Sequence, residues 1–253
     1  MRRFAAPGAA AWAGAVRRAR RVSLAEVRAG GPLMVLAPHP DDEALGAGPL
    51  LAALARTGAE PHLAFVTDGS ASHPDAPGWS PRRLAGARRW EGRRAAVALG
   101  LRRPPVWLGW RDAAPPALTS AKWRRTVRRL GWHLRRLGIR QLVTSWGGEA
   151  HCDHEASARL ADAAARAARS PVRVSSVAVW GWTEATAAAR LRRSRARSVP
   201  VPGGTVAAAR ALACHRSQLG TRVPGSPAGF RLPRPMWGLA RRSPLLLFDG
   251  SGL

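Results

Sequence analysis

The 253-residue sequence predicts an α/β fold with a mainly parallel sheet. Short apolar runs rich in strand-forming residues alternate along the chain with longer helical stretches. This alternation implies crossover connections between parallel strands. The apolar runs show little polar alternation, which is typical of strands buried on both faces of a sheet.

The elements can be placed in order from these patterns. Strands are predicted over residues 33–37, 62–67, 105–108, 139–145, 172–180 and 245–248. Helices are predicted over residues 43–56, 84–99, 121–137, 154–169 and 207–218. Pro38 ends the first strand, and Gly58, Gly100 and Gly138 follow helices as C-terminal caps. Residues 183–205 are basic and show no clear periodicity, so we expect a mobile loop there.

The length and the 46% hydrophobic content suit one domain with a buried core. We place this domain at residues 31–253 and read residues 1–30 as a basic extension, flexible or helical. The extension begins with a weakly apolar run that ends in arginines, unlike a secretory signal peptide. No stretch of the sequence is apolar enough to span a bilayer.

The chain is strongly basic, with 41 Lys and Arg residues against 15 Asp and Glu residues. Lys122 is the only lysine, and the arginines are spread along the chain, which favours a solvated basic surface over a specific nucleic-acid site. Peripheral contact of the basic N-terminus with an anionic membrane is the alternative partner. Cys152 and Cys214 lack disulfide or metal spacing, so we expect a reducing, cytoplasmic setting.

Two polar clusters follow strands that should be neighbours in the sheet. The run His39-Pro40-Asp41-Asp42-Glu43 comes after the first strand, and Glu149 to His154 comes after the fourth. The carboxyl ends of parallel strands meet at one crevice, so both clusters should face it.

The residue types in these clusters suit a catalytic metal. Such a site takes three imidazole or carboxylate ligands and leaves a position open for water. His39 and Asp42 are three residues apart, so a turn entering a helix can aim both at one point, and His154 can be the third ligand. Zinc is the expected ion, and iron(II) suits the same ligands.

The remaining residues of the clusters suit proton transfer. Asp41 would lie beside the metal as a general base. His151 is a candidate acid or oxyanion stabiliser, and Asp153 can hold an imidazole in one tautomer. In the alternative interpretation, the carboxylates complement a helix dipole and the histidines are surface residues. That alternative explains either cluster alone, but helix capping does not require histidines after both strands.

The run from His39 to Glu43 resembles the signature of the PIG-L/LmbE-like family. That family includes N-acetylglucosaminyl-phosphatidylinositol de-N-acetylases and bacterial deacetylases of mycothiol and antibiotic biosynthesis. His151-x-Asp153-His154 is similar to the family's second motif. Further similar segments are Thr67-Asp68-Gly69, the pattern from Arg88 to Gly100, Leu108-Gly109-x-x-Asp112 and the His-x-Ser-Gln run at His215 to Gln218. The resemblance covers the chain from about residue 31 to near its end.

The resemblance implies a Rossmann-like three-layer sandwich and a zinc-dependent hydrolase. Its substrate would be an N-acylated, sugar-like small molecule or glycoconjugate. The implied ligands are His39, Asp42 and His154, with Asp41 as the general base for the attacking water. His151 would be the electrophilic or acid partner, oriented by Asp153. Outside this family, a metal-assisted hydrolase of another amide or ester and a non-enzymatic basic protein that binds nucleic acid or membrane remain alternatives.

Two residues depart from the family pattern. Cys152 stands where the family usually has proline, and we expect a small buried side chain there. Glu149 lies where some members place a tyrosine that stabilises the oxyanion. An anionic glutamate cannot do this, so we expect it to bind a substrate hydroxyl or to make a structural bond.

Other residues are candidates for substrate contact. Arg88 could bind a sugar hydroxyl or phosphate, or lie on a helix surface paired with Glu91. Asp68 and His73 lie on the loop after the second strand, which suits substrate contact. His215 could approach the site or cap its own helix. The sequence indicates neither the acceptor of the acyl group nor an oligomeric state.

Overall fold

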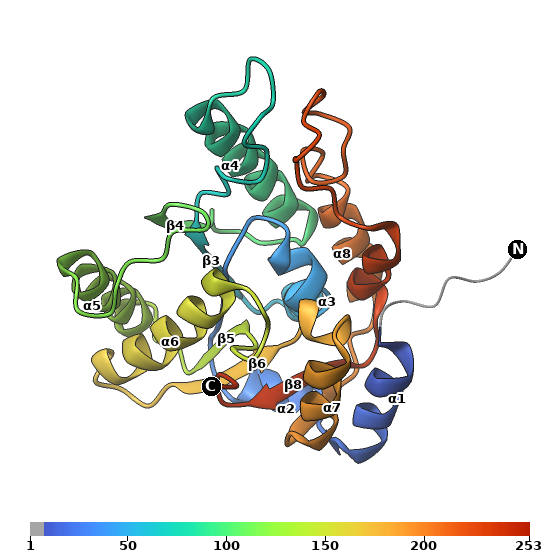
Figure 1. Cartoon of the computed structure of the whole chain (residues 1–253). Helices are drawn as coiled ribbons and strands as arrows, with labels where there is room; N and C mark the ends of the chain where they lie inside the picture. Colours follow the sequence, from blue (N-terminus) through green and yellow to red (C-terminus); the bar gives the residue numbers. More distant parts are fainter. Residues whose placement is uncertain (1–7) are drawn as a thin grey trace, which may run out of the picture.

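In the computed structural model, which describes residues 8–253, helices cover both faces of one central sheet (Figure 1). The described residues contribute eight strands to this sheet, in the order β1-β7-β8-β6-β5-β2-β3-β4. The strands are β1 (Arg20–Arg21), β2 (Leu33–Ala37), β3 (His62–Thr67), β4 (Val106–Trp110), β5 (Gln141–Ser145), β6 (Arg173–Val177), β7 (Ala196–Val199) and β8 (Leu245–Asp249). Only β8 pairs antiparallel with its neighbours among these strands, so the predicted mainly parallel α/β fold is confirmed.

The helices that flank the sheet have the lengths expected for crossover connections. They are α1 (Ala9–Arg18), α2 (Leu24–Ala29), α3 (Gly48–Arg56), α4 (Pro81–Ala98), α5 (Ala121–Arg136), α6 (Cys152–Ala167), α7 (Ala185–Arg193) and α8 (Gly204–Leu212). A π-helical turn, η1 (Glu43–Ala47), precedes α3, and two 3₁₀ segments, η2 (Trp180–Trp182) and η3 (Arg234–Arg241), lie in the C-terminal third of the chain.

The central strand β2 shows why the sheet is covered on both sides. Its five residues are all buried. Leu33 and Val35 pack into the cluster that contains α3, α8 and η3, whereas Met34 and Leu36 pack into the cluster that contains α5 and α6. Successive side chains of a strand point to opposite faces, so a strand that is apolar throughout requires a helical layer on each side.

The connections create a crevice beside β2. From β2 the chain runs outward through β3 to β4, and it then returns to β5 on the other side of β2. In open parallel sheets, such a reversal of strand order leaves a crevice at the carboxyl ends of the two strands. Both predicted polar clusters follow these two strands directly.

Two regions differ from the sequence prediction. The predicted mobile loop at 183–205 is wrong, because it contains α7 and β7. The buried face of α7 consists of Ala187, Ala188 and Leu191. Alanine carries a weak hydrophobic signal, which the surrounding arginines obscure.

In the basic N-terminal segment, α1 and α2 agree with the helical alternative of the prediction, whereas β1 was not expected. Strand β1 pairs with β7, and Ser23 and Glu26 form a capping box at the N-terminus of α2. Residues 1–7 of the predicted extension lie outside the described residues. Within the described part of the chain, no helix is both long and apolar enough to cross a membrane.

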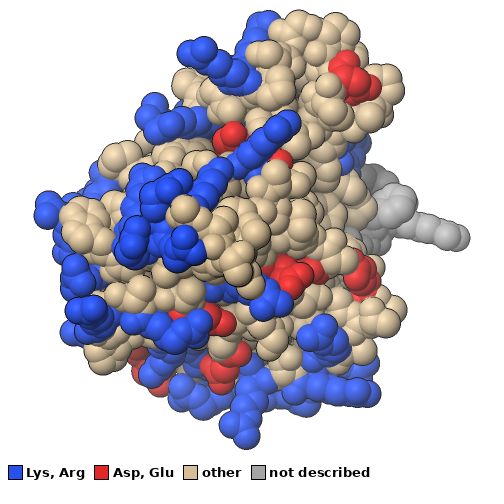
Figure 2. All heavy atoms as spheres, turned by 60° about the vertical axis from the view of Figure 1, so that its left-hand side comes forward, with Lys and Arg blue, Asp and Glu red and all other residues tan. Residues whose placement is uncertain are grey.

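The charges are distributed unequally between surface and interior. Arginine side chains spread over the face that carries α5, with few acidic groups among them (Figure 2). Seven of the chain's 15 acidic residues are buried, namely Asp41, Asp42, Glu43, Glu91, Asp112, Glu149 and Asp153. Buried carboxylates are costly unless they are paired, so their gathering beside the crevice indicates a functional site.

Candidate active site

The first polar cluster is held in a strained turn between β2 and η1. Asp41 has a φ of 141°, in a region that favours glycine. Its backbone N–H donates to Glu43 Oε2 at 2.8 Å, and its carbonyl accepts from the N–H groups of Ala44 and Leu45. Thr67, at the end of β3, donates its N–H and its hydroxyl to the Pro38 carbonyl. The turn is therefore fixed by neighbours on both sides, and Asp41 lies against a cavity.

The second cluster lies at the start of α6. His151 is the N-cap residue, and its Nδ1 accepts the backbone N–H of Asp153 at 3.2 Å. A neutral imidazole whose Nδ1 accepts must carry its proton on Nε2. His151 also lines the cavity.

His39, Asp42 and His154 converge on one point. All three are buried, and their ligand atoms lie within 4.8 Å of one another. Asp42 Oδ2 lies 3.1 Å from His39 Nδ1 and 3.2 Å from His154 Nε2. The second contact lacks the alignment of a hydrogen bond, and His154 Nε2 has no hydrogen-bond partner among the described residues. An unpartnered buried nitrogen that faces a carboxylate and a second imidazole fits a metal site.

The outward nitrogens of both histidines meet carboxylates. His39 Nε2 lies 3.0 Å from Asp153 Oδ2 and 3.2 Å from Asp112 Oδ1. His154 Nδ1 lies 2.5 Å from Glu149 Oε2. Each ring thus has one nitrogen toward Asp42 and the other on a carboxylate, which is the usual surrounding of histidine metal ligands.

A second set, His39, His151 and Asp153, also brings its ligand atoms within 4.8 Å. We favour the first set for two reasons. Asp153 Oδ2 also accepts the Ala113 N–H at 2.8 Å, and His151 Nδ1 is occupied by the helix cap. The first set leaves the carboxylate of Asp153 to orient His39.

The protonation of the cluster reflects its acidic surroundings. Burial lowers the pKa of His39, but hydrogen bonds to Asp112, Asp153 and Asp42 outweigh burial and raise it well above its ordinary value. Burial likewise lowers the pKa of His154, and the Asp42 and Glu149 carboxylates raise it to about 9. Both rings therefore favour protonation, and a bound metal would displace a proton from each ligand nitrogen.

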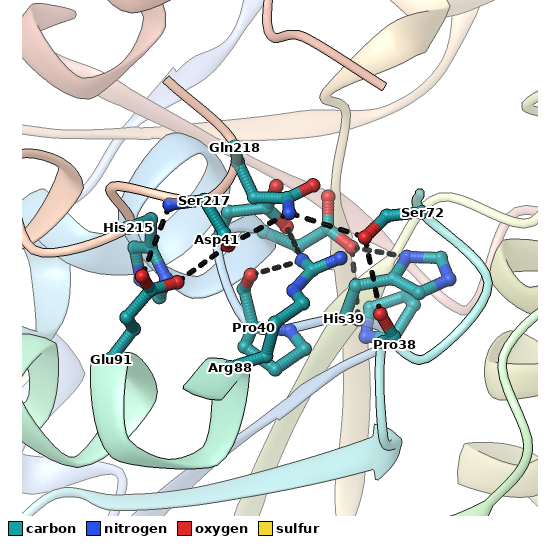
Figure 3. A network of polar contacts seen from close by, with 12 residues as sticks. Pro38, His39, Pro40, Asp41, Ser72, Arg88, Glu91, His215, Ser217 and Gln218 are labelled. Carbon is teal, nitrogen blue, oxygen red and sulfur yellow. Dashed lines mark hydrogen bonds and ion pairs between the residues drawn. The ribbon is translucent and has the colours of Figure 1, made fainter. Parts of the chain in front are cut away.

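Arg88 lies beside Asp41, as Figure 3 shows. Its Nη2 is 3.3 Å from Asp41 Oδ1 and also donates to the Pro40 carbonyl. Burial raises the pKa of Asp41 to about 6, although the Arg88 guanidinium opposes this. A Cβ on Gly69 would meet Arg88 Cδ at 2.6 Å, so the glycine leaves room for the buried arginine. Asp41 therefore has the environment of a general base whose pKa is close to neutral.

A second network supports this corner of the site from α4 and the segment after α8 (Figure 3). Glu91 accepts from the backbone N–H of Ser217 at 3.0 Å and from its hydroxyl at 2.6 Å. Gln218 Nε2 donates to Ser72 Oγ at 3.3 Å, and its Oε1 is buried without a hydrogen-bond partner among the described residues. Arg88 is therefore not paired with Glu91, and its side chain is buried in the site, not on a helix surface.

The cavity beside these residues has a volume of about 300 Å³. Its polar and charged lining residues include His39, Asp41, Asp42, Arg88, Asp112 and His151. Its apolar lining residues include Leu45, Pro74, Trp180, Ala228 and Phe230. Trp180 and Phe230 meet edge to face, with ring centroids 6.0 Å apart. The cavity can thus hold a small molecule that has both polar and apolar groups.

Of the four predicted substrate contacts, only Arg88 lines the cavity. Asp68 Oδ1 instead accepts the N–H groups of Ser70 and Asp112, which joins two loops. His73 is buried behind the cavity, with its Nδ1 3.1 Å from Ser72 Oγ. Both oxygens of Glu149 accept hydrogen bonds within the protein. Of the two roles that we expected for Glu149, the structure therefore favours the structural bond over substrate contact.

Two further expectations differ from the structure. Cys152 is exposed, so the expected buried side chain is wrong, and it belongs to neither candidate ligand set. The carboxylate of Asp153 contacts His39, whereas His151 is oriented by the Asp153 backbone N–H.

Several residues at the site were not assigned a role from the sequence. Asp112 follows β4, so the rule that sites lie at strand ends could have found it. Trp180 and Phe230 gave no comparable signal, because both come from segments that fold back over the crevice. His215 neither lines the cavity nor caps its own helix; its Nε2 lies 2.6 Å from Glu43 Oε1.

Comparison with known families agrees with this geometry. The sequence model of PIG-L, described as GlcNAc-PI de-N-acetylase, matches residues 34–165, which is 132 of the chain's 253 residues. The matched region contains both polar clusters. No curated protein sequence matches the chain.

Similar solved structures share the fold. An N,N'-diacetylchitobiose deacetylase from Pyrococcus horikoshii has a TM-score of 0.59 at 21% identity, covering 81% of this chain and 72% of its own. A deacetylase of teicoplanin biosynthesis has a TM-score of 0.59 at 22% identity, and the match covers 75% of this chain and 86% of that structure's chain. GalB, a 4-carboxy-2-hydroxymuconate hydratase from Pseudomonas putida KT2440, has a TM-score of 0.60 at 14% identity, and the match covers 86% of this chain and 94% of GalB. The hydratase shows that this fold also serves another reaction, so the chemistry must be argued from the site.

Proposed function

This chain belongs to the PIG-L family and is an N-deacetylase, and from that premise we propose that it is a zinc-dependent hydrolase of N-acetylated amino sugars or their conjugates. The observation that carries the proposal is the convergence of His39, Asp42 and His154 beside Asp41. Two imidazoles and one carboxylate form a three-ligand set that leaves room for water and substrate. Zinc is the ion we propose, although the donor set also suits iron(II).

The metal, when bound, supplies polarisation of the amide carbonyl and activation of the attacking water. Asp41 takes the proton from that water, since it lines the cavity between the ligands and Arg88. The guanidinium of Arg88 keeps a share of Asp41 ionised despite its burial. These positions give Asp41 the role of general base.

His151 acts on the carbonyl oxygen as negative charge develops there. Its Nδ1 is occupied by the Asp153 N–H, so its Nε2–H can donate into the cavity. Burial and the neighbouring His39 and His154 rings lower the pKa of His151, which favours a neutral donor over an imidazolium acid. The proton for the departing amine therefore comes from Asp41, which acquired it in the first step.

The cavity walls suit a sugar that carries the acetamide. An apolar sugar face can pack on Trp180 and Phe230, which line the cavity. The acetamide would then lie near His39, Asp41 and Asp42. A role of residues 1–30 in membrane contact and the cytoplasmic setting stay predictions.

The proposal is tested by product analysis. Metal-stripped protein would be reconstituted with Zn²⁺ or Fe²⁺ and incubated with N-acetylglucosamine, N,N'-diacetylchitobiose and a simple acetate ester. We expect acetate and primary amine in equal amounts from an N-acetyl sugar, with no amine release before metal is restored. Cleavage of the ester with no amine from any N-acetyl sugar would contradict the proposed substrate class.

A further inference from the structure

Glu149 is a buried carboxylate with both oxygens engaged inside the protein. Its side chain is 0% exposed. Oε2 lies 2.5 Å from His154 Nδ1, and Oε1 accepts the N–H groups of Val179 at 2.5 Å and Gly181 at 2.9 Å. It does not line the cavity. A side chain placed in this way can act on the reaction only through its partners.

The contact with Glu149 fixes the proton on one nitrogen of His154. A carboxylate accepts hydrogen bonds and has no proton to give, so the Nδ1 of His154 must carry a hydrogen. In the neutral ring, Nε2 then presents a lone pair. That nitrogen faces Asp42 Oδ2 at 3.2 Å and has no hydrogen-bond partner among the described residues. The lone pair is therefore directed at the position where the ligand atoms converge.

We propose that Glu149 is the positioning residue that makes His154 a metal ligand. It holds the ring's orientation and its Nδ1–H tautomer, and its charge increases the basicity of Nε2. This inference rests on the proposed metal-dependent function.

The carboxylate of Glu149 also fixes the segment around Trp180 relative to His154. Val179 and Gly181, whose N–H groups it binds, flank Trp180, and Trp180 lines the cavity. One buried side chain thus connects the loop before α6, a candidate metal ligand and the segment that carries Trp180. Loss of this side chain should disturb the metal site before it disturbs more distant parts of the fold.

The substitution Glu149→Gln tests the proposal with little change of volume. An amide offers one accepting oxygen and one donating NH₂ group. If the oxygen faces Val179 and Gly181, the NH₂ faces His154 Nδ1, which must then accept, and the ring proton moves to the ligand nitrogen. If the amide is turned over, the NH₂ faces two backbone donors. Either orientation opposes metal binding.

The measurement is Zn²⁺ affinity by competition with a chromophoric chelator. We expect a loss of roughly 10- to 100-fold in Glu149→Gln, as for other residues that orient metal-bound histidines. The matched control is Glu155→Gln, in the same helix as His154 but on its exposed side, where Glu155 pairs with Arg159. This control should bind Zn²⁺ as the unmodified protein does.

A second readout separates positioning from general support of the fold. In the zinc-loaded protein, the His154 Nδ1–H should give a strongly downfield proton resonance, assigned by its absence in His154→Ala. Glu149→Gln should lose or shift this resonance while its metal-free form stays folded by circular dichroism. Unchanged Zn²⁺ affinity in Glu149→Gln, with normal binding by the unmodified protein, would overturn the role of Glu149 alone. Absence of zinc binding in the unmodified protein would overturn the metal site and this inference with it.

Discussion

Two buried histidine–glutamate pairs lie near Asp41, the proposed general base, and their contact distances are nearly the same. His154 Nδ1 lies 2.5 Å from Glu149, and His215 Nε2 lies 2.6 Å from Glu43. All four side chains are 0% exposed. The pairs differ in what lies at their far ends.

The far nitrogen of His154 faces Asp42 in the candidate metal site. In the other pair the glutamate makes the contact with the site. Glu43 Oε2 accepts the backbone N–H of Asp41 at 2.8 Å. One pair therefore directs a nitrogen at the candidate metal site, and the other holds the strained backbone of Asp41. The same kind of buried contact can therefore have two uses. Where the histidine faces the metal site, as His154 does, the contact can orient a ligand. Where the glutamate bonds the site, as Glu43 does, the contact can position the proposed base.

The largest effect should come from the residue between the two pairs. Asp41→Asn removes the proposed base but keeps the size of the side chain, so kcat for amine release should fall by about 10²- to 10⁴-fold. Bound metal should be retained, because Asp41 is outside the ligand set. Retention of near-normal kcat would show that another group takes the proton.

His151 differs from the histidines of the two pairs. Its Nδ1 accepts a backbone N–H, whereas each of the other two rings has a nitrogen in contact with a carboxylate. It should therefore offer a proton and not a lone pair to the site. His151→Phe should lower kcat by roughly 10²- to 10³-fold, the usual cost of losing one oxyanion donor. Metal content measured in the same preparation should stay normal, and loss of metal would favour the alternative set of His39, His151 and Asp153.

The pair behind Asp41 should respond differently from the pair at the metal. In Glu43→Gln, the amide oxygen can accept from Asp41, and the NH₂ can donate to His215 Nε2. The ring can then move its proton to Nδ1, which has no hydrogen-bond partner among the described residues. We expect a loss of about 1–3 kcal/mol in the free energy of unfolding, measured by urea denaturation, and unchanged Zn²⁺ affinity. An affinity loss as large as that of Glu149→Gln would remove the distinction between the pairs.

A smaller effect concerns the pH dependence of the base. Burial raises the pKa of Asp41 to about 6, and Arg88 opposes this rise. Asp41 works only when ionised, so activity should fall as the pH drops through its pKa. Removal of the cation in Arg88→Met should raise that pKa and move the acid limb of kcat/KM to higher pH. The exposed neighbour Arg89 provides the control, since Arg89→Met should leave the limb in place.

The sequence predicted the centre of the molecule better than its edge. Strands β2 and β3 fall where the apolar runs placed them, because a strand buried on both faces leaves a continuous hydrophobic signal. The short strands β1 and β7, at one end of the sheet, consist largely of arginine and small residues, so they left no such signal. Their pairing depends on contacts between distant parts of the chain.

The site shows the same limit. The rule that sites lie at strand ends brought His39 and His154 together correctly, since both follow neighbouring parallel strands. The partners of the carboxylates did not follow from spacing. Glu149 and Asp153 each orient a histidine, but the histidine that each one contacts depends on side-chain direction across the crevice.

The central claim is that His39, Asp42 and His154 hold one metal beside Asp41. Its most direct test is elemental analysis of zinc in the reconstituted protein, in His154→Ala and in Asp41→Asn. About one zinc per chain is expected in the unmodified protein and in Asp41→Asn, with little or none in His154→Ala. Equal zinc in His154→Ala, or no stoichiometric metal in the unmodified protein, would contradict the account.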